Sequence, residues 1–570
     1  MSDLFDSGIF PDQIISEILT RLPAKSICRF KSVSKGWYSM ICNPHFMSSY
    51  ISKSSLSWAI FDRFIPFNPK LAASEFTLQW QKPPNVSIFS VNPHKIVDKS
   101  TEIVIEGDEF PATLLASSNG FILFSIKIER DPFKEKTATY FSWISEEDSL
   151  FVVSPITREW VSIPKPPHFI NNQSSVGFIT QVNLSGVLER FIIAEYQPII
   201  GSKTASIMCF SSETCKWEQI SANYMLVMHM WSGDGTVEFD GHLVWVDPRL
   251  GIIVWDEPFS GQNEVHCRFI AFPRESRGSE GDDRLVDVGG GHIQFIELSK
   301  KKKKELSLWR LQDYEGGEWS LVHKLSLKDV WSDESYLAYG LEKVVPNPYL
   351  GYLMHPFEAD IAYFMVGDRL FSLNFGTKKV ESCSSGYSGL SKYIYFIIVK
   401  LPSFPLSFSP SLKATFLKEQ GNKYFKAKNF NEAINYYTRS IALADNVLAY
   451  ANRGMANIKV HRYHEAEADC TEALKLDGEY FKAYGRRAVA RKELGDLTGY
   501  VEDLEFALKL KPNDQEMKKL YAEVKTLIDK VKTTATAPVP TDPPAQNDSS
   551  TAQENGSESV FVHEGSTEDV

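Results

Sequence analysis

Apolar residues recur at helical spacing in the first part of the chain. Pro11 can begin a helix there, because the N–H that proline lacks has no acceptor in the first helical turn. The apolar residues that follow at this spacing are Ile14, Ile15, Ile18, Leu19 and Leu22. Leu22-Pro23 ends the helix, and a second apolar series leads to Ile41 and Pro44. The pattern predicts two or three short helices, which bury too little surface to be stable without a partner.

Residues 1–50 contain a motif that is made up of Phe10-Pro11, Ile18-Leu19, Arg21-Leu22-Pro23, Lys25-Ser26, Arg29-Phe30, Val33-Ser34-Lys35, Trp37, Ile41, Pro44 and Phe46. With these residues at this spacing, the segment resembles the F-box of plant F-box proteins. Phe10 stands where leucine is more usual. The resemblance implies docking onto the SKP-type adaptor of a cullin-based ubiquitin ligase complex, with these expected contacts: Pro11, Ile14, Ile18, Leu22 and Pro23. The alternative is a helical cap on a larger domain.

From about residue 55 to residue 400 the pattern changes to short apolar runs bounded by turn residues. The clearest expected strands are 121–124, 150–153, 160–163, 191–194, 243–246, 251–255 and 371–374. The five lysines at 300–304 lie between two such runs and are typical of a solvated hairpin tip. A long series of strands with Gly and aromatic punctuation predicts either a propeller or a large sandwich.

Several phrases of this β region resemble the F-box-associated domain of plant F-box proteins. They are SNGFIL at 118–123, VSPITREW at 153–160, LWRL at 308–311 and EW at 318–319. The resemblance implies a kelch-related, propeller-like domain that recognises a protein target, whose identity the sequence does not give. No repeat of fixed length is visible, so the number of blades stays open.

The chain becomes irregular over residues 382–410, where Pro402, Pro405 and Pro410 follow an apolar run at 393–399. We expect that run to be the last buried strand of the β domain and residues 401–412 to be a linker. An alternative is that this segment is the seam of a gene fusion or of a misjoined gene model.

Helical spacing then returns and repeats itself. The phrase FNEA at 430–433 is echoed by YHEA at 463–466, 33 residues later, and a third copy begins near Leu497. Small residues recur where two helices would press together, at Gly421, Gly454, Ala433, Ala466 and Ala473. A period near 34 with this spacing is the signature of tetratricopeptide repeats, or TPRs. We expect three repeats and a capping helix over 413–531, with a departure from the pattern at Gly499-Tyr500.

Polar residues on the first helix of each expected repeat line its concave face. Lys418 and Asn422 are four residues apart, as are Lys482 and Arg486, and Asn452 belongs to the middle repeat. Together they offer many hydrogen-bond donors to a small anion. They resemble the carboxylate clamp of chaperone-binding TPR proteins, which implies capture of the C-terminal acidic peptide of cytosolic heat-shock chaperones. The alternative is that each residue is merely solvated.

Composition restricts the function further. The formal charge of -11 argues against nucleic-acid binding, which depends on clustered Lys and Arg. The seven scattered cysteines suggest free thiols in a reducing compartment, hence a cytoplasmic or nuclear location. No run reaches the roughly 18 apolar residues of a membrane helix. The glycines at 289–291 are not followed by the GK[ST] residues of a phosphate-binding loop. Asp282, Asp283 and Asp287 could form a paired-carboxylate site, but the sequence does not tell how far apart their side chains lie. We expect no catalytic residue, metal or cofactor.

The predicted architecture is therefore multidomain. An N-terminal α-helical F-box precedes an all-β, propeller-like domain at 55–400, an all-α TPR solenoid and a disordered acidic tail at 532–570. We interpret the chain as a non-catalytic substrate receptor of an SCF-type ubiquitin ligase whose TPR module binds a chaperone. A second hypothesis is a TPR co-chaperone or assembly factor whose F-box part is a fusion or a gene-model join. A third is an enzyme hidden in the β domain.

Overall fold

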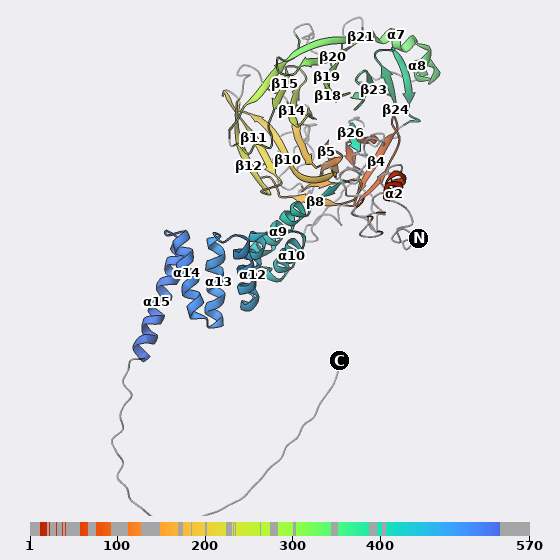
Figure 1. Cartoon of the computed structure of the whole chain (residues 1–570). Helices are drawn as coiled ribbons and strands as arrows, with labels where there is room; N and C mark the ends of the chain where they lie inside the picture. Colours follow the sequence, from red (N-terminus) through yellow and green to blue (C-terminus); the bar gives the residue numbers. More distant parts are fainter. Residues whose placement is uncertain are drawn as a thin grey trace, which may run out of the picture. The chain divides into compact units, whose positions relative to one another are not determined.

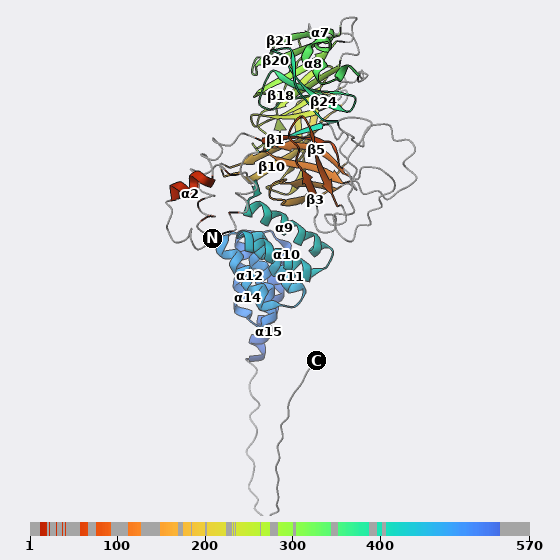
Figure 2. The same ribbon diagram turned by 90° about the vertical axis from the view of Figure 1, so that its right-hand side faces the viewer.

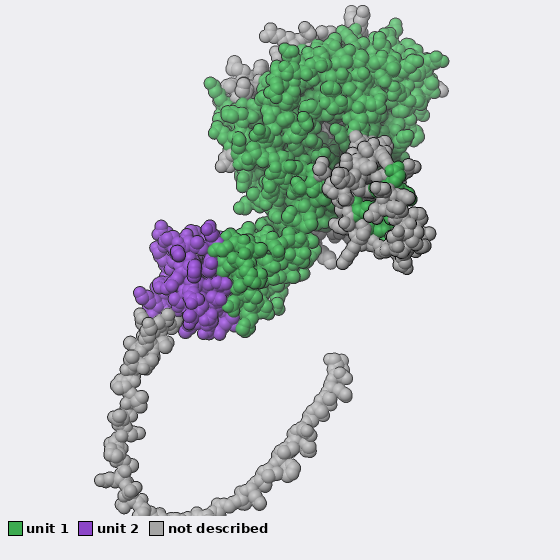
Figure 3. Space-filling view, viewed as in Figure 1, with its two compact units in different colours: residues 1–478 green, residues 479–570 purple. Residues whose placement is uncertain are grey.

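The computed structural model describes the propeller-like region with gaps, the TPR helices almost completely and the N-terminal segment in part. The described residues are 12–19, 22, 30, 33, 37, 40, 57–65, 76–92, 112–126, 149–168, 175–183, 185–199, 202–223, 231, 233, 235–262, 264–273, 283–299, 304–343, 352–386, 396–401 and 406–535. They belong to two compact units, residues 1–478 and residues 479–570 (Figure 3).

The expected strands form six sheets within the described residues, and these sheets are the blades of a six-bladed β-propeller (Figures 1 and 2). Blade 1 contains β26 (Phe396–Leu401), β1 (Ser57–Asp62), β4 (Val86–Val91) and β3 (Phe76–Gln79). Blade 2 contains β2 (Phe64–Ile65), β5 (Ala112–Ser118), β6 (Phe121–Ile126), β7 (Ser149–Val153) and β8 (Trp160–Ile163). Blade 3 contains β9 (Val176–Val182), β10 (Val187–Pro198), β11 (Thr204–Ser211) and β12 (Lys216–Asn223), with β16 (Glu264–Val265) and β27 (Ser407–Phe408) at its edges.

The other three blades are regular four-stranded sheets. Blade 4 contains β13 (Gly235–Phe239), β14 (His242–Asp247), β15 (Gly251–Trp255) and β17 (Cys267–Ala271). Blade 5 contains β18 (Asp283–Gly289), β19 (His292–Leu298), β20 (Glu305–Asp313) and β21 (Glu318–Ser326). Blade 6 contains β22 (Tyr352–Met354), β23 (Ile361–Val366), β24 (Arg369–Asn374) and β25 (Lys379–Cys383), and it is preceded by α7 (Leu327–Ser332), α8 (Glu334–Ala338) and the 3-10 turn Leu341–Lys343. The strands expected from the apolar runs are confirmed.

The ring is closed by a strand from the end of the propeller sequence. The antiparallel pair of β26 and β1 runs from Ser57 opposite Leu401 to Asp62 opposite Phe396. One strand from each blade contacts the corresponding strand of the next blade, in the ring order β26, β5, β9, β13, β18 and β22. Residues 396–399 of the expected apolar run therefore belong to a strand of the domain, β26, and this strand completes blade 1.

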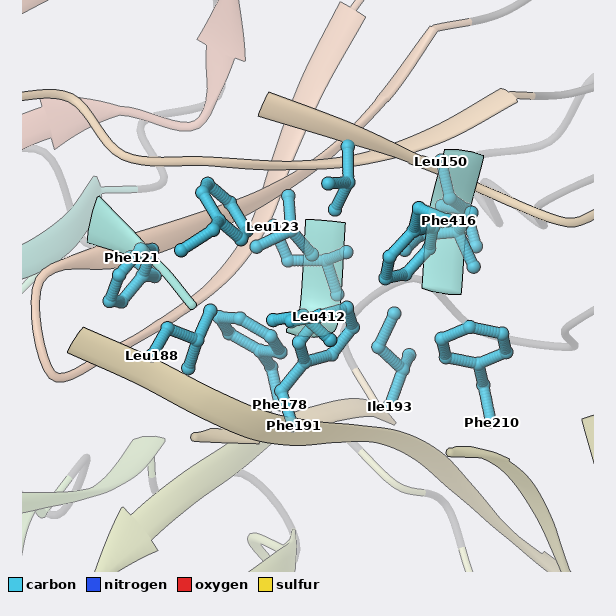
Figure 4. Packing of buried hydrophobic residues seen from close by; sticks show 14 of the residues in the cluster. Phe121, Leu123, Leu150, Phe178, Leu188, Phe191, Ile193, Phe210, Leu412 and Phe416 are labelled. Atoms are coloured by element: carbon cyan, nitrogen blue, oxygen red, sulfur yellow. The ribbon is translucent and has the colours of Figure 1, made fainter. Parts of the chain in front are cut away.

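Apolar side chains fill the junction between each pair of neighbouring blades. The buried residues at the junction of blades 2 and 3 form a large apolar cluster, which Figure 4 shows from close by. Its residues include Phe121, Leu123, Leu150, Phe178, Leu188, Phe191, Ile193 and Phe210, all buried. Successive side chains of a strand point to opposite faces of the sheet, so a strand that is apolar throughout can pack against the blades on both sides.

Residues 406–412, expected in a linker, are instead part of the propeller. The carbonyl oxygen of Leu406 accepts hydrogen bonds from Ser154 Oγ at 2.6 Å and Thr157 Oγ1 at 2.9 Å. β27 pairs in parallel with β10, and the Phe408 N–H donates to Glu159 Oε2 at 3.1 Å. The prolines predicted a loop, but in the described part of this segment the backbone groups of Leu406 and Phe408 are bonded to residues of blade 2, and β27 pairs with blade 3.

The first TPR helix, α9 (Pro410–Lys426), also belongs to the propeller core. Ser409 caps it by accepting a hydrogen bond from the Leu412 N–H at 3.1 Å, and Pro410 occupies the first turn. Leu412 and Phe416 are buried in the junction of blades 2 and 3 (Figure 4), where the Phe416 ring stacks on Phe191 at 6.0 Å. The helix that begins the repeats is thus anchored by the blades.

The TPR helices follow in pairs, as the period predicts. The first unit contains α9, α10 (Phe430–Leu443), α11 (Val447–Lys459) and α12 (Tyr463–Leu476). The second contains α13 (Phe481–Leu494), α14 (Leu497–Leu510) and α15 (Gln515–Ala535). A Cβ at Gly421 would come within 2.6 Å of the Tyr437 ring, and one at Gly454 within 2.9 Å of Cys470 Sγ. The small residues therefore permit the close helix contacts inferred from the sequence. In the part of the chain that is described, no helix has the length and apolarity needed to cross a membrane.

We predict that Phe416→Ala destabilises the full-length chain. The substitution leaves a cavity between two blades, and we expect the free energy of unfolding to fall by about 3 kcal/mol, as for other buried phenylalanines. Urea unfolding followed by tryptophan fluorescence measures this. Leu448→Ala, at a leucine of α11 that is 41% exposed, is the control and should change the free energy by under about 0.5 kcal/mol. Equal losses in the two variants would contradict the anchoring of α9.

Candidate functional site

Helix α2 (Asp12–Leu19) carries the first candidate binding surface. Ile15 and Leu19 are buried, whereas Ile18, from the same apolar series, is 54% exposed. Leu22 is half-buried, and its N–H donates to the Leu19 carbonyl at 3.1 Å. A large apolar side chain that stays exposed beside buried neighbours is available to a partner. Of the other expected adaptor contacts, Pro11, Pro23 and the side chain of Ile14 lie outside the described residues.

The second candidate surface lies on the TPR helices of the first unit. Asn422 on α9 and Asn452 on α11 are joined directly, because Asn452 Nδ2 donates to Asn422 Oδ1 at 2.9 Å. The same oxygen accepts a second bond from the Tyr437 hydroxyl on α10 at 2.7 Å. Three helices thus hold the Asn422 amide, and its oxygen faces two donors. Tyr437 was not singled out from the sequence, and its role in holding Asn422 was missed.

Lys418 lies one turn before Asn422 and is only 7% exposed. Its Nζ is 3.0 Å from Oε1 of Glu419. The other oxygen of that carboxylate, Oε2, accepts a hydrogen bond from Asn422 Nδ2 at 3.0 Å. The structure therefore brings Lys418, Asn422 and Asn452 together and adds Glu419, which the spacing argument did not single out.

The two remaining clamp residues, Lys482 and Arg486, lie one turn apart on α13 in the second unit. Lys482 is exposed and Arg486 is half-buried. Their four-residue spacing gives them the same face of α13, as expected. The convergence of all five residues on one groove stays a prediction.

Buried ion pairs fix the helices that carry these residues. Arg453 on α11 donates to Asp469 on α12 through Nη2 at 2.6 Å, and Asn457 Nδ2 donates to the same carboxylate at 3.0 Å. Burial raises the pKa of Asp469, and the bonds from Arg453 and Asn457 oppose this rise. In the second unit, Arg487 Nη2 donates to Asp503 Oδ1 at 2.7 Å in the same way. Sequence reasoning missed these pairs, although both the arginine and the aspartate recur after 34 residues.

Two acidic residues of the described propeller strands, Asp287 and Glu238, have raised pKa values. Asp287 on β18 accepts a hydrogen bond from the Val288 N–H at 2.7 Å, and burial raises its pKa to about 6 while Lys400 opposes this rise. Burial also raises the pKa of Glu238 on β13. Asp282 and the side chain of Asp283 lie outside the described residues. Among those that are described, no group of three or more His, Cys, Asp and Glu side chains is placed to hold a metal ion.

Comparison with known proteins identifies the larger part of the chain. A family model described as "F-box protein At3g26010-like, beta-propeller" matches residues 98–391, which is just over half of the chain. The chain belongs to this family. A second model, the F-box domain, matches residues 9–49. The F-box and the propeller inferred from sequence resemblance are both confirmed, and a sandwich is excluded.

Relatives match different parts of this F-box propeller protein. The putative F-box/kelch-repeat protein At1g15680 of Arabidopsis thaliana is 24% identical over 404 residues, which cover 68% of this chain and 86% of the relative. Serine/threonine-protein phosphatase 5 of Rattus norvegicus is 38% identical over 117 residues, which cover 20% of this chain and only 23% of the phosphatase. A solved structure, the first TPR of Spaghetti (RPAP3) bound to HSP90 peptide SRMEEVD, is 38% identical over 21% of this chain and 95% of that chain, with a TM-score of 0.20.

We predict that Asp287→Asn stabilises the propeller at neutral pH. The pKa of Asp287 is higher in the folded chain than in the unfolded chain, so protonation of its carboxyl group favours folding. This contribution to stability is lost as the pH rises through about 6. The variant, which is neutral at every pH, should be more stable than the wild type by about 2–3 kcal/mol at pH 7.5 and by about 1 kcal/mol at pH 4.5.

Urea unfolding at the two pH values measures this difference. The exposed Glu257 provides the control, and Glu257→Gln should change the stability little at either pH. A gain from Asp287→Asn that does not depend on pH would argue against a buried, titrating carboxylate.

Proposed function

We propose that this F-box propeller protein is a non-catalytic substrate receptor of an SCF-type ubiquitin ligase and that its TPR module binds the C-terminal acidic peptide of a cytosolic heat-shock chaperone. One observation carries the proposal: α9 anchors the repeats in the propeller through Leu412 and Phe416, and it also bears Lys418 and Asn422. The propeller that would recognise a target and the first two residues of the clamp would then belong to the same compact unit.

The adaptor would bind at α2. Ile18 provides an exposed apolar side chain on a helix that matches the F-box domain, and such anchors supply much of the energy of a docking interface. The propeller would select the protein target. The work of the complex is tethering, since a target held beside the ubiquitin-loaded enzyme reacts at a raised effective concentration. No bond chemistry in this chain is needed.

The chaperone peptide would bind at the TPR residues. A free C-terminal carboxylate accepts charge-assisted hydrogen bonds from ammonium, guanidinium and amide groups. Lys418, Asn422 and Asn452 supply such groups in the first unit, and Lys482 and Arg486 supply them on one face of α13. We place the complex in the cytoplasm or the nucleus, where cytosolic chaperones and unpaired cysteines are both expected.

The alternative is a TPR co-chaperone or assembly factor whose F-box part is a fusion or a gene-model join. The contacts of residues 406–416 with blades 2 and 3 favour a single product, because a chance join would leave apolar residues such as Phe408 and Phe416 without matching cavities. Retention of a chaperone peptide without retention of the adaptor would favour this alternative.

We predict that Ile18→Asp weakens the retention of a purified SKP-type adaptor by on the order of tenfold or more, because a carboxylate would be buried in an apolar interface. Biolayer interferometry with the full-length chain measures the dissociation constant. Ile199→Asp, at an isoleucine that is 47% exposed on the propeller, is the matched control and should leave adaptor binding unchanged. Undiminished binding by the Ile18 variant would remove α2 from the interface.

We predict that the double variant Lys482→Glu, Arg486→Glu loses at least about tenfold in affinity for the acidic peptide SRMEEVD, because two donors become repulsive charges. Fluorescence anisotropy of the labelled peptide measures this, and adaptor binding should not change. Lys509→Glu with Lys525→Glu makes the same charge change at exposed positions of α14 and α15 and is the control. Equal affinity in the two double variants would contradict the clamp assignment.

A further inference from the structure

Glu419 occupies a special position in the repeat pattern. Glu419, Asn452 and Arg486 are 33 and 34 residues apart, so they hold the same place in three successive repeats. Two of these three residues belong to the proposed clamp, where they would donate to an anion. The first repeat has an acid at this place. The Glu419 carboxylate lies among hydrogen-bond donors that we assign to the carboxylate of the peptide, and its presence there requires a physical explanation.

The contacts of Glu419 show what its carboxylate does. Oε1 lies 3.0 Å from Lys418 Nζ, and Oε2 accepts a bond from Asn422 Nδ2 at 3.0 Å. One carboxylate thus engages two of the donors that a peptide terminus would use, with one oxygen on each. The rest of the Asn422 amide is committed as well, because its oxygen accepts from Tyr437 and Asn452.

Lys418 needs such a partner because of its surroundings. Phe416 is buried in the same cluster as Cys215, which lies in the turn after β11, so this part of α9 lies against the blades and Lys418 is only 7% exposed. A buried ammonium without a partner would be costly. Glu419 offsets that cost while its own side chain remains 30% exposed, so it can turn out into water.

We propose that Glu419 is an internal stand-in for the peptide carboxylate and that it occupies Lys418 and Asn422 until a chaperone terminus displaces it. This inference rests on the proposed function. An incoming free carboxylate takes over the bonds to Lys418 Nζ and Asn422 Nδ2, and Glu419 becomes solvated. The empty site then has no unpaired buried charge, and the cost of displacing Glu419 is subtracted from the affinity for the peptide.

The test compares the full-length wild type with Glu419→Gln, which keeps the shape of the side chain and removes its charge. The probe is SRMEEVD in two forms, one with a free C-terminal carboxylate and one with a C-terminal amide. Glu419→Gln should bind the free acid roughly three- to fivefold more tightly, the effect of one partly exposed ion pair, and the amide by under about twofold.

Two further variants keep the result interpretable. Glu472→Gln removes the same charge from an exposed pair with Lys475 on α12 and should leave both affinities unchanged. Glu419→Asp keeps the charge but shortens the side chain by one methylene, so it should also tighten binding of the free acid. It replaces Glu419→Gln as the decisive variant if circular dichroism shows that the latter does not fold.

The possible outcomes separate this inference from the proposed function. Equal affinity of the wild type and both Glu419 variants for the free acid, with binding still lost on charge reversal at Lys482 and Arg486, would overturn the stand-in and leave the clamp intact. An equal gain with the amide, or with Glu472→Gln, would reduce the effect to general repulsion and also overturn it. Absence of binding in the wild type and in every variant would overturn the clamp, and the stand-in with it.

Discussion

The burial of one end of helix α9 in the junction between two blades is the constraint on which the placement of the first TPR residues depends. Leu412 and Phe416 fill space that Phe191 and Phe210 would otherwise leave open to water. The residues just before them are held by blade 2, since both Ser154 and Thr157 bond to the Leu406 carbonyl. Because α9 cannot leave this place without exposing apolar surface, the polar residues further along the helix inherit a defined position beside blade 3.

Much of the fold could be predicted because hydrophobic period is a local property. The short apolar runs predicted the strands, whereas the choice of a propeller over a sandwich came from the family resemblance. The return of a small residue after 33 positions predicted the helix pairs, as the fit of Gly421 against Tyr437 shows. The docking of residues 406–412 could not be predicted this way. Pro410 was assigned to a linker, whereas it opens α9 behind the cap of Ser409. The burial of a short apolar segment such as residues 406–412 depends on contacts with blades that are far away in the sequence, and a local pattern does not reveal such contacts.

The candidate site shows the same division. Spacing along a helix assigns Lys418 and Asn422 to one face, but it does not say which atoms satisfy them. The partners found in the structure, Glu419 beside them and Tyr437 on the next helix, depend on side-chain conformations. The pair of Arg453 and Asp469 could have been found, since both recur one repeat later, but a repeated charge is commonly a solvated one.

The strand that completes blade 1 has a consequence for the synthesis of the chain. β1 emerges from the ribosome early, whereas β26, its antiparallel neighbour, follows only after the other five blades have been made. Until then one edge of β1 carries open backbone hydrogen-bonding groups, and nascent chains with such edges are prone to associate. The residues that fill the junction of blades 2 and 3 are synthesised shortly after β26. Closure of the ring and completion of this junction therefore become possible at nearly the same time during translation.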